Sequence, residues 1–378
     1  MQRLEQIAEL FAENFTSFGE LGASLCIWRH DEPVINLAGG YCDREANQQW
    51  TSKTPVLIWS ATKGLASACL IHAAWANGIR LDRKVTDFWP EYGENAKAET
   101  TLLQILAHQA GQPALRDPAI SILDHEAVAD QLARQRPFWK PGEAHGYHPR
   151  TYGFLLDELV RRITGKTPLG TYFQKMFAEP FGLDLWIGLP DSAAPRVAPI
   201  FAPRKVREPN TEDGFYQALA QPDSLTRRSF STPAGLHAPS SMNDPAIRRH
   251  SLPSLGGIGT AESLARFYAC LGANRFFPPE MVDQIGKEQS EGPDKVLQAS
   301  TAFGIGFMKD PVAEGRKIRG LFGSSLQAFG QPGSGGSLGF YDPENKVAFA
   351  YVMNQMEPGL FPNAKSLRIV KHLYDACL

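Results

Sequence analysis

The segment Trp59-Ser60-Ala61-Thr62-Lys63-Gly64-Leu65 sets a hydroxyl and an amine three residues apart, after a strand-like stretch. Residues i and i+3 share one face of a helix, so a helix beginning here brings the Lys63 amine to the Ser60 hydroxyl. A serine alcohol is a weak nucleophile that needs an adjacent base, and a helix N-terminus favours developing negative charge. The stretch after Lys63 is almost entirely apolar, which predicts a buried helix. The structural alternative is that Ser60 caps the helix and Lys63 lies on its surface.

Two further segments carry groups that suit a catalytic pocket. Tyr147 stands on a predicted loop, five residues after Pro141-Gly142 and six before Gly153, where a helix opens. Phe329 to Tyr341 forms a Gly-rich strand of the kind that lets a backbone pass close to a ligand.

These segments resemble those of the serine β-lactamase and penicillin-binding-protein superfamily, in particular the class C β-lactamase-like esterases (family VIII carboxylesterases). Ser60 and Lys63 match the Ser-x-x-Lys motif, whose serine is the nucleophile, and Tyr147 matches the tyrosine of the second motif. Gln331-Pro332-Gly333-Ser334 falls where the lactamases carry Lys-Thr-Gly-Ser. Leu106 to Gly111 looks like the structural His-x-x-Gly helix end of the family. The resemblance extends from the Ser60 segment to Tyr351.

The resemblance implies acyl transfer through a Ser60 acyl-enzyme, with Lys63 and Tyr147 as a coupled base and no metal or organic cofactor. A Lys63 ammonium beside Tyr147 would favour its phenolate, and burial would lower the pKa of the lysine. By resemblance, the backbone N–H groups of Ser60 and Ser334 form the oxyanion hole. Oxyanion and substrate contacts are expected from Ser334, Gln331, Gly333 and His148, the last in either a substrate-contact or a supporting role.

Two departures from the lactamases bear on the substrate. Pro149 stands two residues after the tyrosine, where the lactamases have an asparagine that holds the substrate's amide carbonyl. Neutral Gln331 replaces the lysine that helps to bind the substrate carboxylate. Both changes point to short-chain neutral carboxylic esters as substrates. A β-lactamase or D-amino-peptide amidase on the same fold is the first alternative, and a non-enzymatic ligand-binding protein is the second.

Two rival sites are weaker. Gly335-Gly336-Ser337-Leu338-Gly339 satisfies the Gly-x-Ser-x-Gly pattern, with Asp342 and His372 following in the required order. That serine needs a strand-to-helix turn, whereas the residues after Ser337 predict a hairpin. His145 and His148 flank Tyr147, but a pair on a Pro/Gly loop lacks the fixed face of a zinc site.

Composition narrows the remaining function classes. The 378 residues hold 38 Lys+Arg against 40 Asp+Glu, without a long basic run, so we expect no nucleic-acid partner. The N-terminus predicts an amphipathic helix and no secretory signal, and no apolar run is long enough for a bilayer, which predicts a cytoplasmic protein without a membrane partner. Five dispersed cysteines without CxxC spacing predict buried thiols. The expected partner is a small-molecule ester, and the oligomeric state stays open.

The elements that position these residues alternate between β-rich ends and a helical middle. Strands are predicted over 23–30, 34–41, 302–308, 337–341 and 347–353, and helices over 64–77, 102–108, 125–135, 152–164 and about 363–376. The segment 190–253 has little periodicity, so we expect long loops there that form a wall of the cleft. The predicted class is α/β (α+β), β-lactamase/transpeptidase-like, with an antiparallel sheet flanked by helices. Residues 1–75 and 255–378 would form the sheet domain, and 76–254 the inserted helical lobe.

Overall fold

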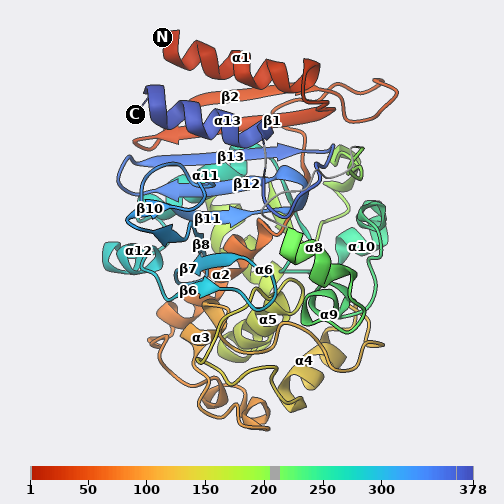
Figure 1. Cartoon of the computed structure of the whole chain (residues 1–378), viewed down its shortest axis with the longest axis vertical. Coiled ribbons are helices and arrows are strands. Elements are labelled where there is room, and N and C mark those ends of the chain that lie inside the picture. Colours follow the sequence, from red (N-terminus) through yellow and green to blue (C-terminus); the bar gives the residue numbers. More distant parts are fainter. Residues whose placement is uncertain (1, 205–212, 363, 378) are drawn as a thin grey trace.

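The computed structural model describes residues 2–204, 213–362 and 364–377. Its main feature is one sheet of eight strands, in the order β2-β1-β13-β12-β11-β8-β7-β6, in which all neighbours pair antiparallel (Figure 1). Its strands are β1 (Gly22–Arg29), β2 (Glu32–Gly40), β6 (Ser290–Pro293), β7 (Ser300–Phe303), β8 (Met308–Lys309), β11 (Phe329–Pro332), β12 (Leu338–Asp342) and β13 (Val347–Met353). Both ends of the chain therefore build the sheet, which confirms the prediction.

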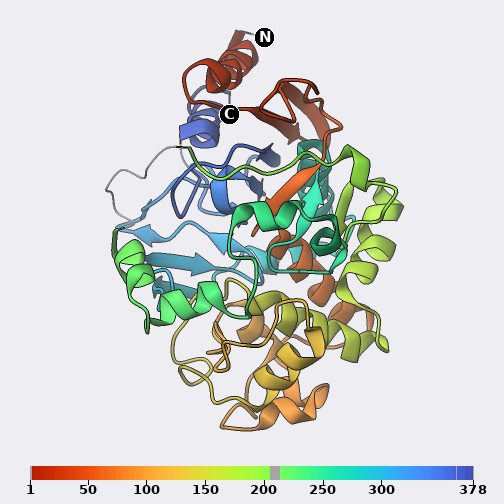
Figure 2. The same cartoon turned by 90° about the vertical axis from the view of Figure 1, so that its right-hand side faces the viewer.

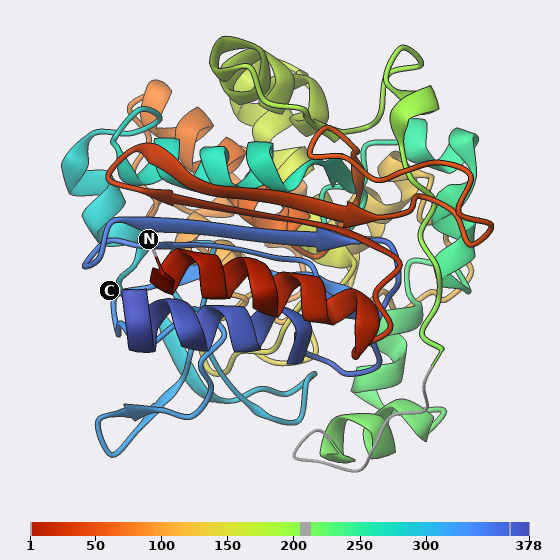
Figure 3. The ribbon, with the colours of Figure 1, turned by 90° about the horizontal axis from the view of Figure 1, so that it is seen from above.

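Helices cover both faces of this sheet. Helices α1 (Gln2–Thr16) and α13 (Ala364–His372) lie side by side on one face, and α11 (Ala261–Gly272) lies on the other (Figure 3). On the first face Phe11 meets Tyr351 of β13 edge to face, and Asn14 donates a hydrogen bond to the Tyr351 hydroxyl at 3.2 Å. All seven residues of β13 are buried, because a central strand covered on both faces needs a continuous apolar run.

The middle of the chain is mainly helical, and in Figure 1 most of it lies below the sheet, whereas residues 213–249 lie to the right of the sheet. Its helices are α2 (Thr62–Ala76), α3 (Leu102–Leu106), α4 (His125–Arg134), α5 (Thr151–Thr164), α6 (Leu169–Phe173), α7 (Glu179–Phe181), α8 (Asp213–Ala220), α9 (Leu225–Ser231) and α10 (Pro245–Arg249), and α12 (Pro279–Ile285) follows α11. Helix α2 is buried from Thr62 to Ala74 and packs against α5 and α6, so it forms the axis of this part. The division at residues 75 and 254 stays a prediction.

Small sheets complete the fold. Strands β3 (Val56–Trp59), β5 (Gly257–Gly259) and β4 (Leu185–Ile187) form a separate three-stranded antiparallel sheet, and β9 (Val312–Ala313) pairs with β10 (Arg316–Lys317). Among the described helices, none has both the length and the apolar composition that crossing a bilayer requires. Cys26, Cys42 and Cys69 are buried free thiols and Cys270 is partly buried, whereas the side chain of Cys377 lies outside the description.

Two predictions about elements are wrong. The expected strand 302–308 is a tight hairpin, because Gly306 adopts a φ of 80° and its carbonyl accepts a hydrogen bond from the Ser67 hydroxyl of α2 at 2.7 Å. The segment 190–253 contains α8, α9 and α10 instead of loops alone, and its residues 205–212 lie outside the described part. The last two of these helices begin at side-chain caps, Ser224 and Asp244.

Candidate active site

Ser60 lies, half-buried, in the turn that joins β3 to α2. The preceding Trp59 has a φ of 50°, in the left-handed region, so the chain turns abruptly out of the strand. The Thr62 hydroxyl fastens this turn, because it donates to the Trp59 carbonyl and accepts from the Gly257 N–H of β5 at 2.8 Å. Ser60 is therefore held between a paired strand and a buried helix.

Lys63 is fully buried in the first turn of α2, and its Nζ contacts three oxygens. These are Ser60 Oγ at 3.2 Å and the carbonyls of Pro149 at 2.9 Å and Ser254 at 2.8 Å. Within the described residues no carboxylate lies within ion-pair distance of this amine. Burial without a counter-charge lowers the pKa of Lys63 well below its usual value, which favours the neutral amine.

Tyr147 lies on the loop before α5 and faces both residues. Its ring covers Lys63 Nζ at 4.7 Å from the ring centre, and its hydroxyl accepts a hydrogen bond from Gln331 Nε2 at 3.3 Å. Burial raises the pKa of Tyr147, and hydrogen bonding to Ser60 opposes that rise. The lysine thus faces the ring, and burial favours phenol over phenolate.

The Gly-rich segment that begins at Phe329 lies beside Tyr147 and β3. Gln331, on β11, is buried, whereas Ser334 is exposed. A Cβ on Gly333 would lie 2.2 Å from the Ile58 carbonyl oxygen, so glycine lets this segment lie directly against β3. No described residue accepts a hydrogen bond from the backbone N–H of Ser60 or of Ser334, which leaves both donors free for an oxyanion.

His148 does not line the cavity beside Ser60. It is 1% exposed, its Nδ1 meets the Gly146 carbonyl at 2.6 Å, and its Nε2 accepts from the Gln112 N–H at 3.0 Å. Burial lowers the pKa of His148 to about 3, so the ring is neutral, with Nδ1 as the donor. This geometry favours the supporting role over substrate contact. His108, of the expected helix end, accepts from the His148 N–H at 3.2 Å and also supports the loop.

A cavity of about 240 Å³ opens over these groups and is lined by Ser60, Tyr147, Gln331, Gly333 and Ser334. The rest of its lining is apolar or aromatic: Phe215, Tyr216, Leu219, Phe230, Leu297, Met308, Pro332, Gly359, Leu360 and Phe361. None of these described lining residues carries a formal charge. The cavity therefore suits a neutral, apolar ligand.

The aromatic wall of the cavity comes from α8 and α9, which lie beside the C-terminal strands (Figure 2). Phe215 and Phe230 meet edge to face, with ring centres 5.2 Å apart. The segment 190–253 thus contributes a wall of the cleft, as expected, but through helices. The individual residues were not predicted, because the segment lacks the periodicity that would have marked an apolar face.

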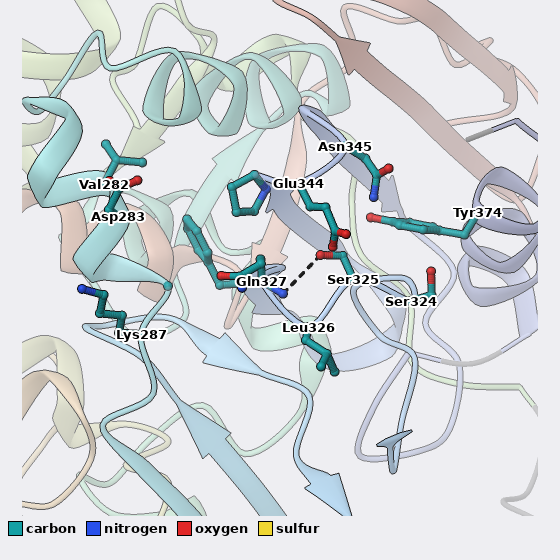
Figure 4. Close-up of a pocket in the computed structure, with 13 residues that line it drawn as sticks. Val282, Asp283, Lys287, Ser324, Ser325, Leu326, Gln327, Glu344, Asn345 and Tyr374 are labelled. Atoms are coloured by element: carbon teal, nitrogen blue, oxygen red, sulfur yellow. Dashed lines mark hydrogen bonds between the residues drawn. The ribbon is translucent and has the colours of Figure 1, made fainter. Parts of the chain in front are cut away.

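A larger cavity of about 1110 Å³ lies between α12, the segment 324–327 and the turn at 343–345 (Figure 4). It shares no lining residue with the Ser60 cavity. Two of its hydroxyl groups have other partners, since Ser325 Oγ accepts from the Gln327 N–H at 3.1 Å and the Tyr374 hydroxyl donates to Asp342 at 2.7 Å. Size alone therefore does not identify the reactive site.

The rival sites do not assemble. Ser337 is fully buried and leads into β12, not into a helix, and the recorded side-chain partners of Asp342 are Tyr374 and Asn345. The described residues contain no group of three or more His, Cys, Asp or Glu side chains that could hold a metal ion.

Comparison with known proteins agrees with this geometry. A sequence model of the Beta-lactamase family matches residues 9–373. The chain is 29% identical to the Esterase/beta-lactamase LipL of Mycobacterium tuberculosis over 364 residues, which cover 94% of this chain and 82% of LipL. It is 24% identical to Esterase EstB of Burkholderia gladioli, over 78% of this chain and 77% of EstB.

Two solved structures are similar over nearly the whole chain. A family VIII carboxylesterase superposes with a TM-score of 0.87 at 29% identity, covering 100% of this chain and 98% of the other. A penicillin-binding protein homologue from Caulobacter crescentus superposes with a TM-score of 0.85 at 32% identity, covering 99% and 98%. These matches confirm the resemblance and the fold class predicted from the sequence.

Proposed function

The chain belongs to the beta-lactamase family and is a serine hydrolase, and on that premise we propose that it cleaves short-chain, neutral carboxylic esters through a Ser60 acyl-enzyme. The observation that carries the proposal is the contact set of the buried Lys63 amine beside an uncharged cavity.

A neutral amine has two N–H donors and one lone pair. The carbonyls of Pro149 and Ser254 accept the two donors of Lys63, which leaves the lone pair for the Ser60 hydroxyl at 3.2 Å. Lys63 then accepts the Ser60 proton as Oγ attacks the ester carbonyl. Pro149 contributes to this geometry through its backbone oxygen, so no polar side chain is needed at this position to orient the base.

Tyr147 is the proton donor to the leaving group in this scheme. Tyr147 lines the cavity, and its hydroxyl stays protonated because burial raises its pKa. The ester C–O bond breaks as the leaving alcohol takes a proton from Tyr147, which is re-protonated from Lys63. Water then attacks the acyl carbon and gives a proton to the same base, the bond between the acyl group and Ser60 Oγ breaks, and Oγ takes that proton back as the acid leaves. The N–H groups of Ser60 and Ser334 hold the oxyanion, and one such donor contributes about 3 kcal/mol.

The uncharged cavity supports neutral substrates. A carboxylate-bearing β-lactam would meet Gln331 instead of a cation and would lose a charge-assisted hydrogen bond worth about 1.5–3 kcal/mol, roughly 10- to 150-fold in kcat/KM. β-Lactam hydrolysis is the second candidate function, favoured by the combined name of the relative LipL.

One experiment separates these functions. We expect a fluorophosphonate probe to label Ser60, and p-nitrophenyl acetate and butyrate to be hydrolysed with higher kcat/KM than a chromogenic cephalosporin. Gln331→Lys should improve the cephalosporin relative to the butyrate. Labelling at Ser337 contradicts the assigned nucleophile, and no labelling supports a binding protein. A cephalosporin kcat/KM at or above that of the butyrate moves the assignment to a β-lactamase.

A further inference from the structure

Asp294 is a buried aspartate in the loop between β6 and β7, with 3% of its surface exposed. Its Oδ1 accepts hydrogen bonds from the backbone N–H groups of Val296 and Leu297, both at 2.8 Å. These bonds close the loop on itself. Leu297, at the end of this short turn, lines the cavity over Ser60.

The same carboxylate also binds the backbone of Tyr147, which is 147 residues away in the sequence. The Tyr147 N–H lies 2.9 Å from Oδ2 and 3.1 Å from Oδ1. The Thr301 hydroxyl donates to Oδ2 at 3.0 Å, and His145 Nε2 lies 3.0 Å from that hydroxyl. A backbone hydrogen bond from the Lys295 N–H to the His145 carbonyl, at 3.2 Å, also joins the Asp294 loop to the Tyr147 loop.

Tyr147 lies on a loop and not on a helix. Its neighbours have bonds of their own, from the Gly146 N–H to the His108 carbonyl and from the His148 N–H to His108 Nδ1. The N–H of Tyr147 itself is bound by Asp294. The tyrosine hydroxyl must meet the nucleophile and the leaving group within a fraction of an ångström. Buried N–H bonds to a carboxylate are charge-assisted and shorter and stronger than neutral ones, so they suit this purpose.

We propose that Asp294 is the positioning residue for Tyr147: its carboxylate fixes the tyrosine loop to the cavity wall at Leu297 and so sets the tyrosine hydroxyl for proton transfer. The inference rests on the proposed function, because it concerns the same acyl transfer. A purely structural account would make Asp294 the closure of its own loop and nothing more.

Asp294→Asn separates the two accounts. The asparagine keeps one oxygen, which can still accept from Val296 and Leu297, and replaces the second with an NH₂ group. That group is a donor facing the Tyr147 N–H, so the 2.9 Å bond to Tyr147 is lost and only the longer 3.1 Å contact with the kept oxygen remains, while the local loop closure survives. We expect kcat for p-nitrophenyl acetate to fall on the order of 10²-fold, the loss typical of a 1 Å misplacement, with KM within about threefold of wild type.

Asp157→Asn is the matched control. Asp157 is a buried carboxylate on α5 whose Oδ1 accepts the Leu169 N–H at 2.7 Å, and it lines no part of the cavity. We expect the control to lose thermal stability but to keep kcat within about threefold. If wild type hydrolyses the ester, an Asp294→Asn kcat within threefold of wild type, or no lower than that of the control, overturns the proposal.

A wild type without hydrolysis or Ser60 labelling instead overturns the proposed function, so the two failures are distinguishable. Should Asp294→Asn not fold, Asp294→Glu supplies the test, since it keeps charge and acceptors but moves them by one methylene. We expect a folded Asp294→Glu to lose kcat about tenfold with little change in KM. An unchanged kcat in that variant would also overturn the positioning role.

Discussion

Gly333→Ala tests the geometry of the site with a single methyl group. Gly333 has φ −113° and ψ 150°, which alanine adopts without strain, so any effect comes from the space around the new Cβ. That atom would lie 2.2 Å from the Ile58 carbonyl oxygen and 3.1 Å from the Ser337 Cβ. Real Cβ contacts essentially never fall under 3.0 Å, so the backbone must move by about 0.8 Å.

The movement pushes the segment that carries Ser60 away from the segment that carries Ser334. Ile58 lies in β3, two residues before Ser60, and Gly333 directly precedes Ser334. Pushing these segments apart lengthens the distance between the two N–H donors proposed for the oxyanion, and losing one donor costs about 10²- to 10³-fold in kcat. Overpacking should also lower the free energy of unfolding by about 1–3 kcal/mol.

The assay compares kcat and KM for p-nitrophenyl acetate, together with thermal unfolding. Gly320→Ala is the control, because a Cβ there has no neighbour within 4 Å, and it should behave as wild type. Gly333→Ala should lose kcat far more than it raises KM. A Gly333→Ala kcat within about threefold of wild type would refute the steric argument, since it would show that the proposed donors do not depend on this contact.

Further predictions concern the reactive groups and the cavity wall. Ser60→Ala and Tyr147→Phe should each abolish ester turnover, with Lys63→Ala nearly as severe, and their combination should cost little more than the worst single change; near-normal turnover in any folded variant contradicts the assignment. Ser337→Ala should leave kcat nearly unchanged, because its buried Oγ has no hydrogen-bond partner among the described residues. Lys63→Met should unfold at higher denaturant than wild type near neutral pH. The pKa of Lys63 is lowered in the folded protein, so at pH values below 10.5, the ordinary pKa of lysine, the unfolded chain binds one proton more than the folded chain. The wild type therefore loses stability as the pH falls below 10.5, and the variant does not. Phe215→Ala should raise the kcat/KM of longer acyl esters relative to acetate, by roughly fourfold for each methylene that the widened cavity buries; an unchanged chain-length profile would show that the acyl group lies elsewhere.

The sequence predicted the parts of this molecule that local patterns encode. Apolar runs such as β13 indicated central strands, and apolar residues at helical spacing between charged ones indicated α1. Ser60, Lys63 and Tyr147 were predicted from motifs in order along the chain, and the structure brings their side chains together. The buried Lys63 amine is held by a pair of backbone carbonyls, which no side-chain pattern indicates.

Other features depend on contacts between distant segments and had no local signal. Asp294 follows Gly292-Pro293 and has the appearance of an ordinary turn residue, since aspartate favours turns for its own backbone. Its bond to Tyr147 exists only because the β6–β7 loop meets the tyrosine loop in space. Phe215 likewise gave no sign of lining the cavity, because α8 is short and its surroundings carry turn-forming residues.

The pairing of β1 with β13 also delays completion of the sheet while the chain is being synthesised. The β1–β2 hairpin is made well before β13, since Asn14, in the helix before β1, stands 337 residues from Tyr351 of β13. At about 5–20 residues per second, the apolar edge of β1 waits on the order of half a minute for its neighbour. During that interval the nascent chain presents an unpaired strand to other chains, so we expect slower initiation and lower temperature to raise the yield of folded protein.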